Sequence, residues 1–260
     1  MPSTRKPATR NKRSVAGRAI KFALPAGSIR LFSARPTNWL TMTVEARANY
    51  VMTFLVQIAG YPVNGAAGIV GNLWAESDIL PNRIEGSLAT RPMRAPDRNR
   101  IPRDFTPQEV MDRIENSRGP LLAGIGIAQW TLPSRRANFF KHSYAGRAAG
   151  AAIIDDMDAQ IDFLVAELGS RSFSSVDKLL RDKLVTLNDA SDEVVYNFEV
   201  PGAILFANNT KKPRGNQDVQ KVFAQRRKLS TATLNAYQST QPILAHILSS
   251  RSKKVKRLRV

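Results

Sequence analysis

The chain has 260 residues, and 43% of them are hydrophobic, a share that supports a folded core and argues against wholesale disorder. It contains no cysteine, which excludes disulfides, thiolate catalysis and cysteine-based zinc sites, and its two histidines disfavour a histidine-rich metal site or a catalytic triad. We therefore expect neither a metal nor a cofactor, and one large domain with appendages or at most two domains.

The net charge of +18 is concentrated at the two ends of the chain. Residues 1–44 hold nine Lys and Arg and no acid, and residues 200–260 hold 13 basic residues and one acid, whereas residues 45–199 hold 17 basic and 20 acidic residues. Such ends indicate anionic partners, for example DNA, lipopolysaccharide or an acidic protein. We expect no transmembrane segment, because no apolar run of about 18 residues occurs.

The first predicted elements follow a basic arm without periodicity over residues 1–42. A helix is predicted from Thr43, its N-cap, to Ala59. A second helix is predicted from an Asn64 cap to Ser77, and its Gly68 and Gly71 share one side, which allows another backbone to approach closely.

An irregular polar region with a short hairpin is predicted over residues 82–104, and a helix with a capping box and a proline in its first turn begins at Thr106. A clear amphipathic helix is predicted over residues 152–168, with apolar residues on one stripe. Further helices are predicted at 134–142, 174–184, 190–198 and 217–237. The chain is thus predicted to be mostly helical.

The stretch Gly124–Thr131, GIGIAQWT, suits neither a core strand nor a helix, because both avoid glycine. Its bare backbone is predicted to approach another chain or a ligand. As a cleft wall it would expose N–H and C=O groups to a sugar, with Gln129 as an additional donor and acceptor.

Glu76 is the candidate acid, because it lies at the end of a predicted helix. The negative end of the helix dipole and apolar neighbours such as Trp74 are expected to raise its pKa. A carboxylic acid that stays protonated near neutral pH is what cleavage of a glycosidic bond requires.

Two motifs, AAGIVGNLWAESDILPN and GIGIAQWT, together resemble the phage tail-type lysozyme family. The pairing of Glu-Ser with a later Gly-aliphatic-x-Gln is also similar to goose-type lysozymes and soluble lytic transglycosylases. AQIDFLVAEL and YNFEVPG extend the resemblance, which covers about residues 44–237.

The resemblance implies a lysozyme-like fold of the α+β class, predominantly α-helical, with a small irregular or β region beside the cleft. It implies a catalytic domain at 43–237 and bacterial peptidoglycan as the substrate. It also implies Glu76 as the catalytic acid. The implied substrate-binding residues are Ser77, Gly124, Gly126 and Gln129. Residues 238–260 lie outside the resemblance and are predicted from their charge to be a basic C-terminal tail.

Other positions keep two interpretations. Asp78 stands where the family has glycine, which indicates a left-handed residue or a second carboxylate, although Glu85 is the better-placed second carboxylate and Asp97 a weaker one. Trp130 is as compatible with the core as with a sugar platform. Tyr196 resembles a tyrosine of transglycosylase clefts but also suits a half-buried structural role. We expect Glu199 to cap a helix or to form an ion pair.

The leading functional hypothesis is a muramidase of a phage tail or internal core, which cleaves the β-1,4 bond between N-acetylmuramic acid and N-acetylglucosamine during genome delivery. It would contact other virion proteins and act in the host periplasm and cell wall. Three alternatives stay open: a lytic transglycosylase of the same fold, a free endolysin, and an inactive basic structural virion protein.

Overall fold

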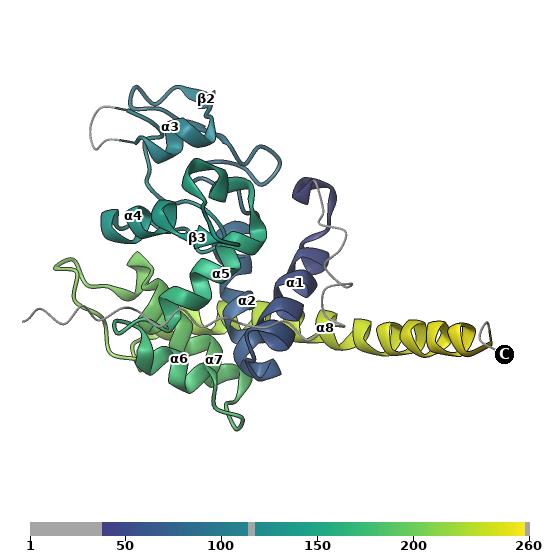
Figure 1. Ribbon diagram of the computed structural model, residues 1–260. Helices are drawn as coiled ribbons and strands as arrows, with labels where there is room; N and C mark the ends of the chain where they lie inside the picture. The colour runs from purple at the N-terminus through teal and green to yellow at the C-terminus, as the bar shows by residue number, and fades with distance from the viewer. Residues whose placement is uncertain (1–37, 114–117, 258–260) are drawn as a thin grey trace, which may run out of the picture. The chain divides into compact units, whose positions relative to one another are not determined.

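The computed structural model describes residues 38–113 and 118–257, with side chains up to residue 240. Most of the predicted arm, residues 1–37, lies outside the described residues. The described part is mainly helical with two small antiparallel sheets, which confirms the predicted α+β, predominantly helical class (Figure 1). No described helix is long and apolar enough to cross a membrane.

The N-terminal helices begin close to the predicted positions. After the short helix η2 (Trp39–Thr41), Thr43 caps α1 (Val44–Thr53) by accepting a hydrogen bond from Ala46 N, as predicted. A π-helical turn, η3 (Phe54–Ile58), continues α1.

The second helix, α2 (Val63–Ser77), starts after Pro62, so the predicted Asn64 cap is wrong. Asn64 lies inside the helix, and its side chain donates a hydrogen bond to Val185 O at 3.0 Å. The Asn64 side chain, which local spacing assigned to capping, therefore bonds to a residue 121 positions later in the sequence.

Helix α2 lies in the middle of the fold and packs against α1, α7 (Leu187–Glu193) and α8 (Gln217–Arg257) (Figure 1). Its glycines permit this packing. A Cβ at Gly68 would lie 2.6 Å from Ala190 Cβ of α7, and a Cβ at Gly71 would lie 2.4 Å from Ser230 N of α8. The predicted close approach of another backbone is confirmed on both glycines.

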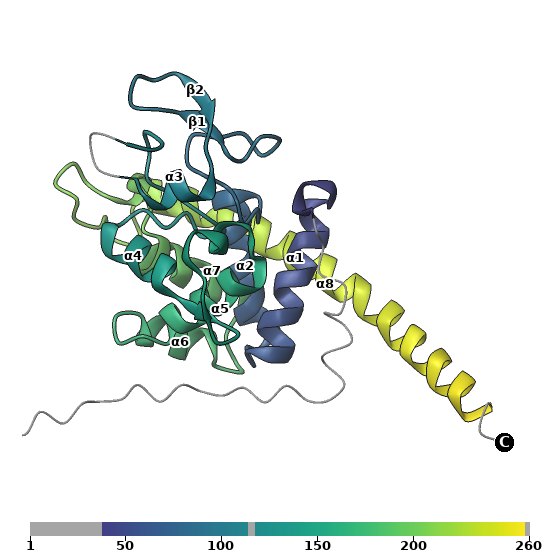
Figure 2. The same cartoon turned by 45° about the horizontal axis from the view of Figure 1, so that its top comes forward.

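The region after α2 forms a small lobe. Strands β1 (Arg94–Pro96) and β2 (Pro102–Asp104) pair antiparallel, which confirms the predicted hairpin (Figure 2). The next helix, α3 (Pro107–Met111), has the predicted capping box: Glu109 N donates to the Thr106 hydroxyl, and Thr106 N donates to the Glu109 carboxylate.

The later elements follow in the predicted order. The apolar stripe predicted over residues 152–168 is buried, with one residue in η4 (Gly150–Asp155) and four in α5 (Met157–Leu168): Ile154, Met157, Ile161, Leu164 and Leu168. Helix α8 continues past the predicted end at 237 to Arg257. The bounds are α4 (Pro133–Lys141), β3 (Ser143–Tyr144), β4 (Arg147–Ala148), η4 (Gly150–Asp155), α5 (Met157–Leu168), α6 (Ser174–Leu180), η5 (Val194–Glu199) and η6 (Gly202–Ile204).

Candidate active site

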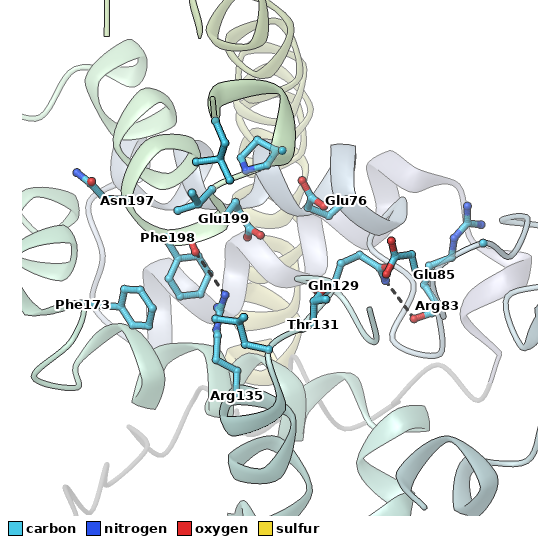
Figure 3. A pocket seen from close by; sticks show the side chains of 16 residues that line it. Glu76, Arg83, Glu85, Gln129, Thr131, Arg135, Phe173, Asn197, Phe198 and Glu199 are labelled. Carbon is cyan, nitrogen blue, oxygen red and sulfur yellow. Dashed lines mark hydrogen bonds between the residues drawn. The ribbon is translucent and has the colours of Figure 1, made fainter. Parts of the chain in front are cut away.

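A pocket of about 700 Å³ lies between the end of α2, the loop that follows α2, the start of α4, and η5 (Figure 3). It brings together three carboxyl groups and two guanidinium-bearing residues from distant parts of the chain. Its lining residues are Glu76, Arg83, Glu85, Gly86, Gln129, Thr131, Leu132, Arg135, Phe173, Asn197, Phe198, Glu199, Val200, Pro201, Gly202 and Leu205.

Glu76 occupies the last turn of α2 and lines this pocket. Its carboxylate accepts a hydrogen bond from Nη2 of Arg226, a residue of α8, and the two side chains are 20% and 11% exposed. Arg226 also donates to Asn72 O at 3.2 Å, so its guanidinium lies against the end of α2. The sequence indicated only the helix dipole and Trp74 as influences on Glu76, whereas the structure adds a cation 150 residues away.

Glu85 lines the same pocket, as expected of a second carboxylate. Its Oε2 accepts a hydrogen bond from Gly124 N at 2.9 Å, and its own backbone N donates to Gly124 O at 2.8 Å. A Cβ at Gly124 would lie 3.0 Å from Glu85 Oε2 and 2.9 Å from Gln129 Oε1. This glycine therefore positions a pocket carboxylate, and Gly124 itself does not line the pocket.

Gly126 and Trp130 are buried, and neither lines the pocket, so burial favours the core interpretation of Trp130 and speaks against a substrate contact of Gly126. Gly126 has a φ of +71°, and a Cβ there would lie 2.6 Å from Gln160 Oε1 and 2.9 Å from the Trp130 ring. Trp130 is fully buried and donates from Nε1 to Glu167 at 2.8 Å. The second glycine of GIGIAQWT is needed for a left-handed turn against a buried indole.

Replacing Gly126 with valine is therefore expected to reduce stability and activity together, because a β-branched residue is strained at positive φ and meets the Trp130 ring. Thermal unfolding and peptidoglycan clearing, measured on the same preparation, test this. A variant that keeps the wild-type melting temperature and loses activity alone would instead place Gly126 at the substrate.

Three other candidate residues, Ser77, Tyr196 and Asp78, lie outside the pocket lining. Ser77 is buried, donates to Ile127 O at 2.7 Å and thereby joins α2 to the 124–131 loop. The hydroxyl of Tyr196 donates a hydrogen bond to Lys212 O at 2.8 Å. Asp78 has a φ of 54°, which confirms the left-handed residue, and it also lies outside the pocket lining.

Gln129 is the residue of the GIGIAQWT stretch whose predicted place in the cleft agrees with the pocket. Its Nε2 donates to Arg83 O at 3.1 Å and to Gly126 O at 2.9 Å, so the amide also ties two loops together.

The sequence did not indicate the arginines of the pocket, and it predicted only a capping or pairing role for Glu199. Arg135 makes two hydrogen bonds of 2.8 Å with the carboxylate of Glu167 and lies 4.5 Å from the centre of the Phe198 ring. Glu199 was expected to cap or pair, but its Oε1 is buried without a hydrogen-bond partner among the described residues. The signal that could have identified Glu199 was its place in YNFEVPG.

Electrostatics distinguish Glu199 from the other pocket residues. Burial raises the pKa of Glu199 well above its usual range, and the negative charge of Glu76 raises it further. Arg135 and Arg226 lower this pKa, and Glu167 raises it. The pocket thus holds a carboxyl group that favours its neutral form.

Comparison with known families gives one match. The family model described as phage tail lysozyme matches residues 46–223, a segment that contains Glu76, Glu85 and Glu199 but not Arg226. No curated protein and no solved structure matches the chain.

Proposed function

From the premise that this chain belongs to the phage tail lysozyme family, we propose that it is a muramidase that cleaves the β-1,4 bond between N-acetylmuramic acid and N-acetylglucosamine. The family by itself makes the chain a phage peptidoglycan hydrolase in general terms. The observation that carries the finer proposal is the meeting of Glu76 and Glu85 in one pocket (Figure 3). Two carboxyl groups beside one glycan are the machinery of most glycoside hydrolases.

In this proposal Glu76 donates its proton to the glycosidic oxygen as the bond to the anomeric carbon breaks. The sugar then carries oxocarbenium character, and a water molecule attacks the anomeric carbon. Glu85, whose carboxylate is oriented by Gly124 N, accepts the proton of that water. The half-buried ring of Phe173 in the pocket wall suits contact with a bound sugar.

The proposed setting is a phage tail or internal core, where the enzyme opens the host cell wall for genome delivery beside other virion proteins. The basic ends of the chain support contact with polyanions such as lipopolysaccharide or DNA, since residues 1–44 contain no acid and residues 200–260 contain one.

Mass spectrometry of the fragments released from purified peptidoglycan tests the bond and the reaction. We expect fragments that end in reducing N-acetylmuramic acid, because a water molecule completes the proposed reaction. Fragments that end in 1,6-anhydro-N-acetylmuramic acid would instead make the chain a lytic transglycosylase, and a folded protein that releases nothing would support the inactive structural alternative.

In the same assay, the variant Glu85→Gln is expected to release reducing ends about 100-fold more slowly, as is typical for loss of a general base. The variant Glu45→Gln, an exposed residue in the first turn of α1, is the matched control and should behave like the wild type. Unchanged hydrolysis by Glu85→Gln would remove Glu85 from the mechanism.

A further inference from the structure

Glu199 brings a third carboxyl group to the pocket, and the cations that act on it are already paired. Arg135 is held by the two hydrogen bonds with Glu167, and Arg226 is bound to Glu76. Oε1 of Glu199 is buried and accepts no hydrogen bond from any residue that the structure describes. An ionised Glu199 would thus be a buried carboxylate without a counter-charge of its own, which is costly.

Figure 3 shows the carboxyl groups of Glu76 and Glu199 reaching the same pocket from different elements, α2 and η5. The charges that act on Glu199 come from four surrounding helices: Glu76 of α2, Arg135 of α4, Glu167 of α5 and Arg226 of α8. Arg83 and Glu85 complete the charged lining. The two acidic neighbours and burial favour the neutral form of Glu199, and the two arginines oppose it without prevailing.

We propose that Glu76 and Glu199 form a pair of carboxyl groups in one pocket that carries one proton in total, because the charge of one disfavours the charge of the other, so that Glu199 is a positioning residue for the proton that Glu76 delivers. This inference rests on the proposed role of Glu76 as the acid. Ionisation of one carboxyl group favours the protonated form of the other, so two neighbouring carboxyl groups hold one proton more firmly than a single hydrated carboxyl group does. The proton moves from the pair to the glycosidic oxygen, Glu85 takes the proton of the attacking water, and proton exchange with the solvent then restores the pair and releases the proton of Glu85.

The raised pKa of Glu199 makes the free energy of unfolding depend on pH. In the unfolded chain a glutamate has a pKa of about 4.3, whereas burial raises the pKa of Glu199 in the folded protein. Below that pH both states hold the proton and Glu199 costs nothing. As the pH rises above it, only the unfolded state releases the proton, so Glu199 lowers the free energy of unfolding until its folded pKa is passed. A destabilising group kept in a pocket indicates a functional role.

The test is the variant Glu199→Gln, which mimics the protonated side chain and cannot ionise. We expect its melting temperature to exceed that of the wild type at pH 8 and to equal it at pH 4. We expect its kcat/KM on peptidoglycan fragments to approach that of the wild type at pH 4 and to fall below it by about tenfold or more at pH 9, since each pKa unit of coupling is a factor of about ten.

Glu193→Gln is the matched control, because Glu193 lies six residues earlier and its carboxylate is paired with Arg214. Its melting temperature should not rise at pH 8, and the shape of its pH profile should stay that of the wild type. A lower melting temperature of Glu199→Gln at pH 8, or a loss of activity by the same factor at every pH, would overturn the proton-sharing pair.

The comparison of melting temperatures requires no substrate, so its outcome does not depend on the proposed function. An inactive wild-type protein whose Glu199→Gln variant still gains stability at pH 8 would refute the muramidase and retain the neutral Glu199. An active wild type without that gain would refute the pair alone.

Discussion

Replacing Glu76 with glutamine is expected to reduce peptidoglycan cleavage by about 10²–10⁴-fold, the range typical of losing a general acid. The amide keeps the shape of the side chain but has no proton to give to the leaving oxygen. Glu76 lines the pocket from the last turn of α2, and its partner Arg226 holds the side chain toward α8. Release of soluble fragments from purified peptidoglycan measures the effect.

Stability must be measured beside activity, because Glu76→Gln also removes the charge that Arg226 binds. Losing one member of a partly buried ion pair lowers the free energy of unfolding, so we expect a reduced melting temperature with a cooperative transition. Circular dichroism establishes that the variant is folded at the assay temperature, and Glu45→Gln provides the active control. Clearing of peptidoglycan by a folded Glu76→Gln at the wild-type rate would remove Glu76 from the mechanism.

A large loss of stability is expected from the substitution Gly71→Ala. Its Cβ would lie 2.4 Å from both N and Cα of Ser230, and because these are backbone atoms, α8 would have to move away from α2. Alanine gains about 1 kcal/mol of helix propensity over glycine, but this overpacking exceeds that gain. We expect the free energy of unfolding to fall by about 2 kcal/mol or more in a denaturant titration.

Activity should fall with it, because α8 carries Arg226 one turn before Ser230 and a displaced helix moves the guanidinium away from Glu76. Gly215→Ala is the matched control, since a Cβ at Gly215 meets no atom within 4 Å. Its stability should stay within about 0.5 kcal/mol of the wild type. A Gly71→Ala variant as stable as this control would contradict the close contact between α2 and α8.

Much of the local structure could be predicted because its causes lie within a few residues. The Thr43 cap and the Thr106–Glu109 capping box are hydrogen bonds across three residues. The buried stripe from Ile154 to Leu168 follows helical periodicity. Two glycines three residues apart in α2 indicated a close helix contact, because a residue without a side chain lets the backbone of another helix approach.

The hairpin of β3 and β4 was not predicted, although its turn is short. Ala145 and Gly146 connect the strands with φ values of 50° and 78°. Alanine is not a typical turn residue at positive φ, so the local sequence gave no signal beyond one glycine.

The sequence by itself determined the helical class, the two lysozyme-like motifs and the position of Glu76 at a helix end, because these depend on spacing along the chain. Only the tertiary structure decided what each motif residue contacts. It placed Trp130 in the core, Gly124 behind Glu85, and Arg226, 150 residues away, on Glu76. The physical reason is that charge pairing and burial depend on the neighbours that helix packing supplies. The approach of α8 to Gly71 brings Arg226 to Glu76, whereas Oε1 of Glu199, at the end of η5, has no hydrogen-bond partner among the described residues.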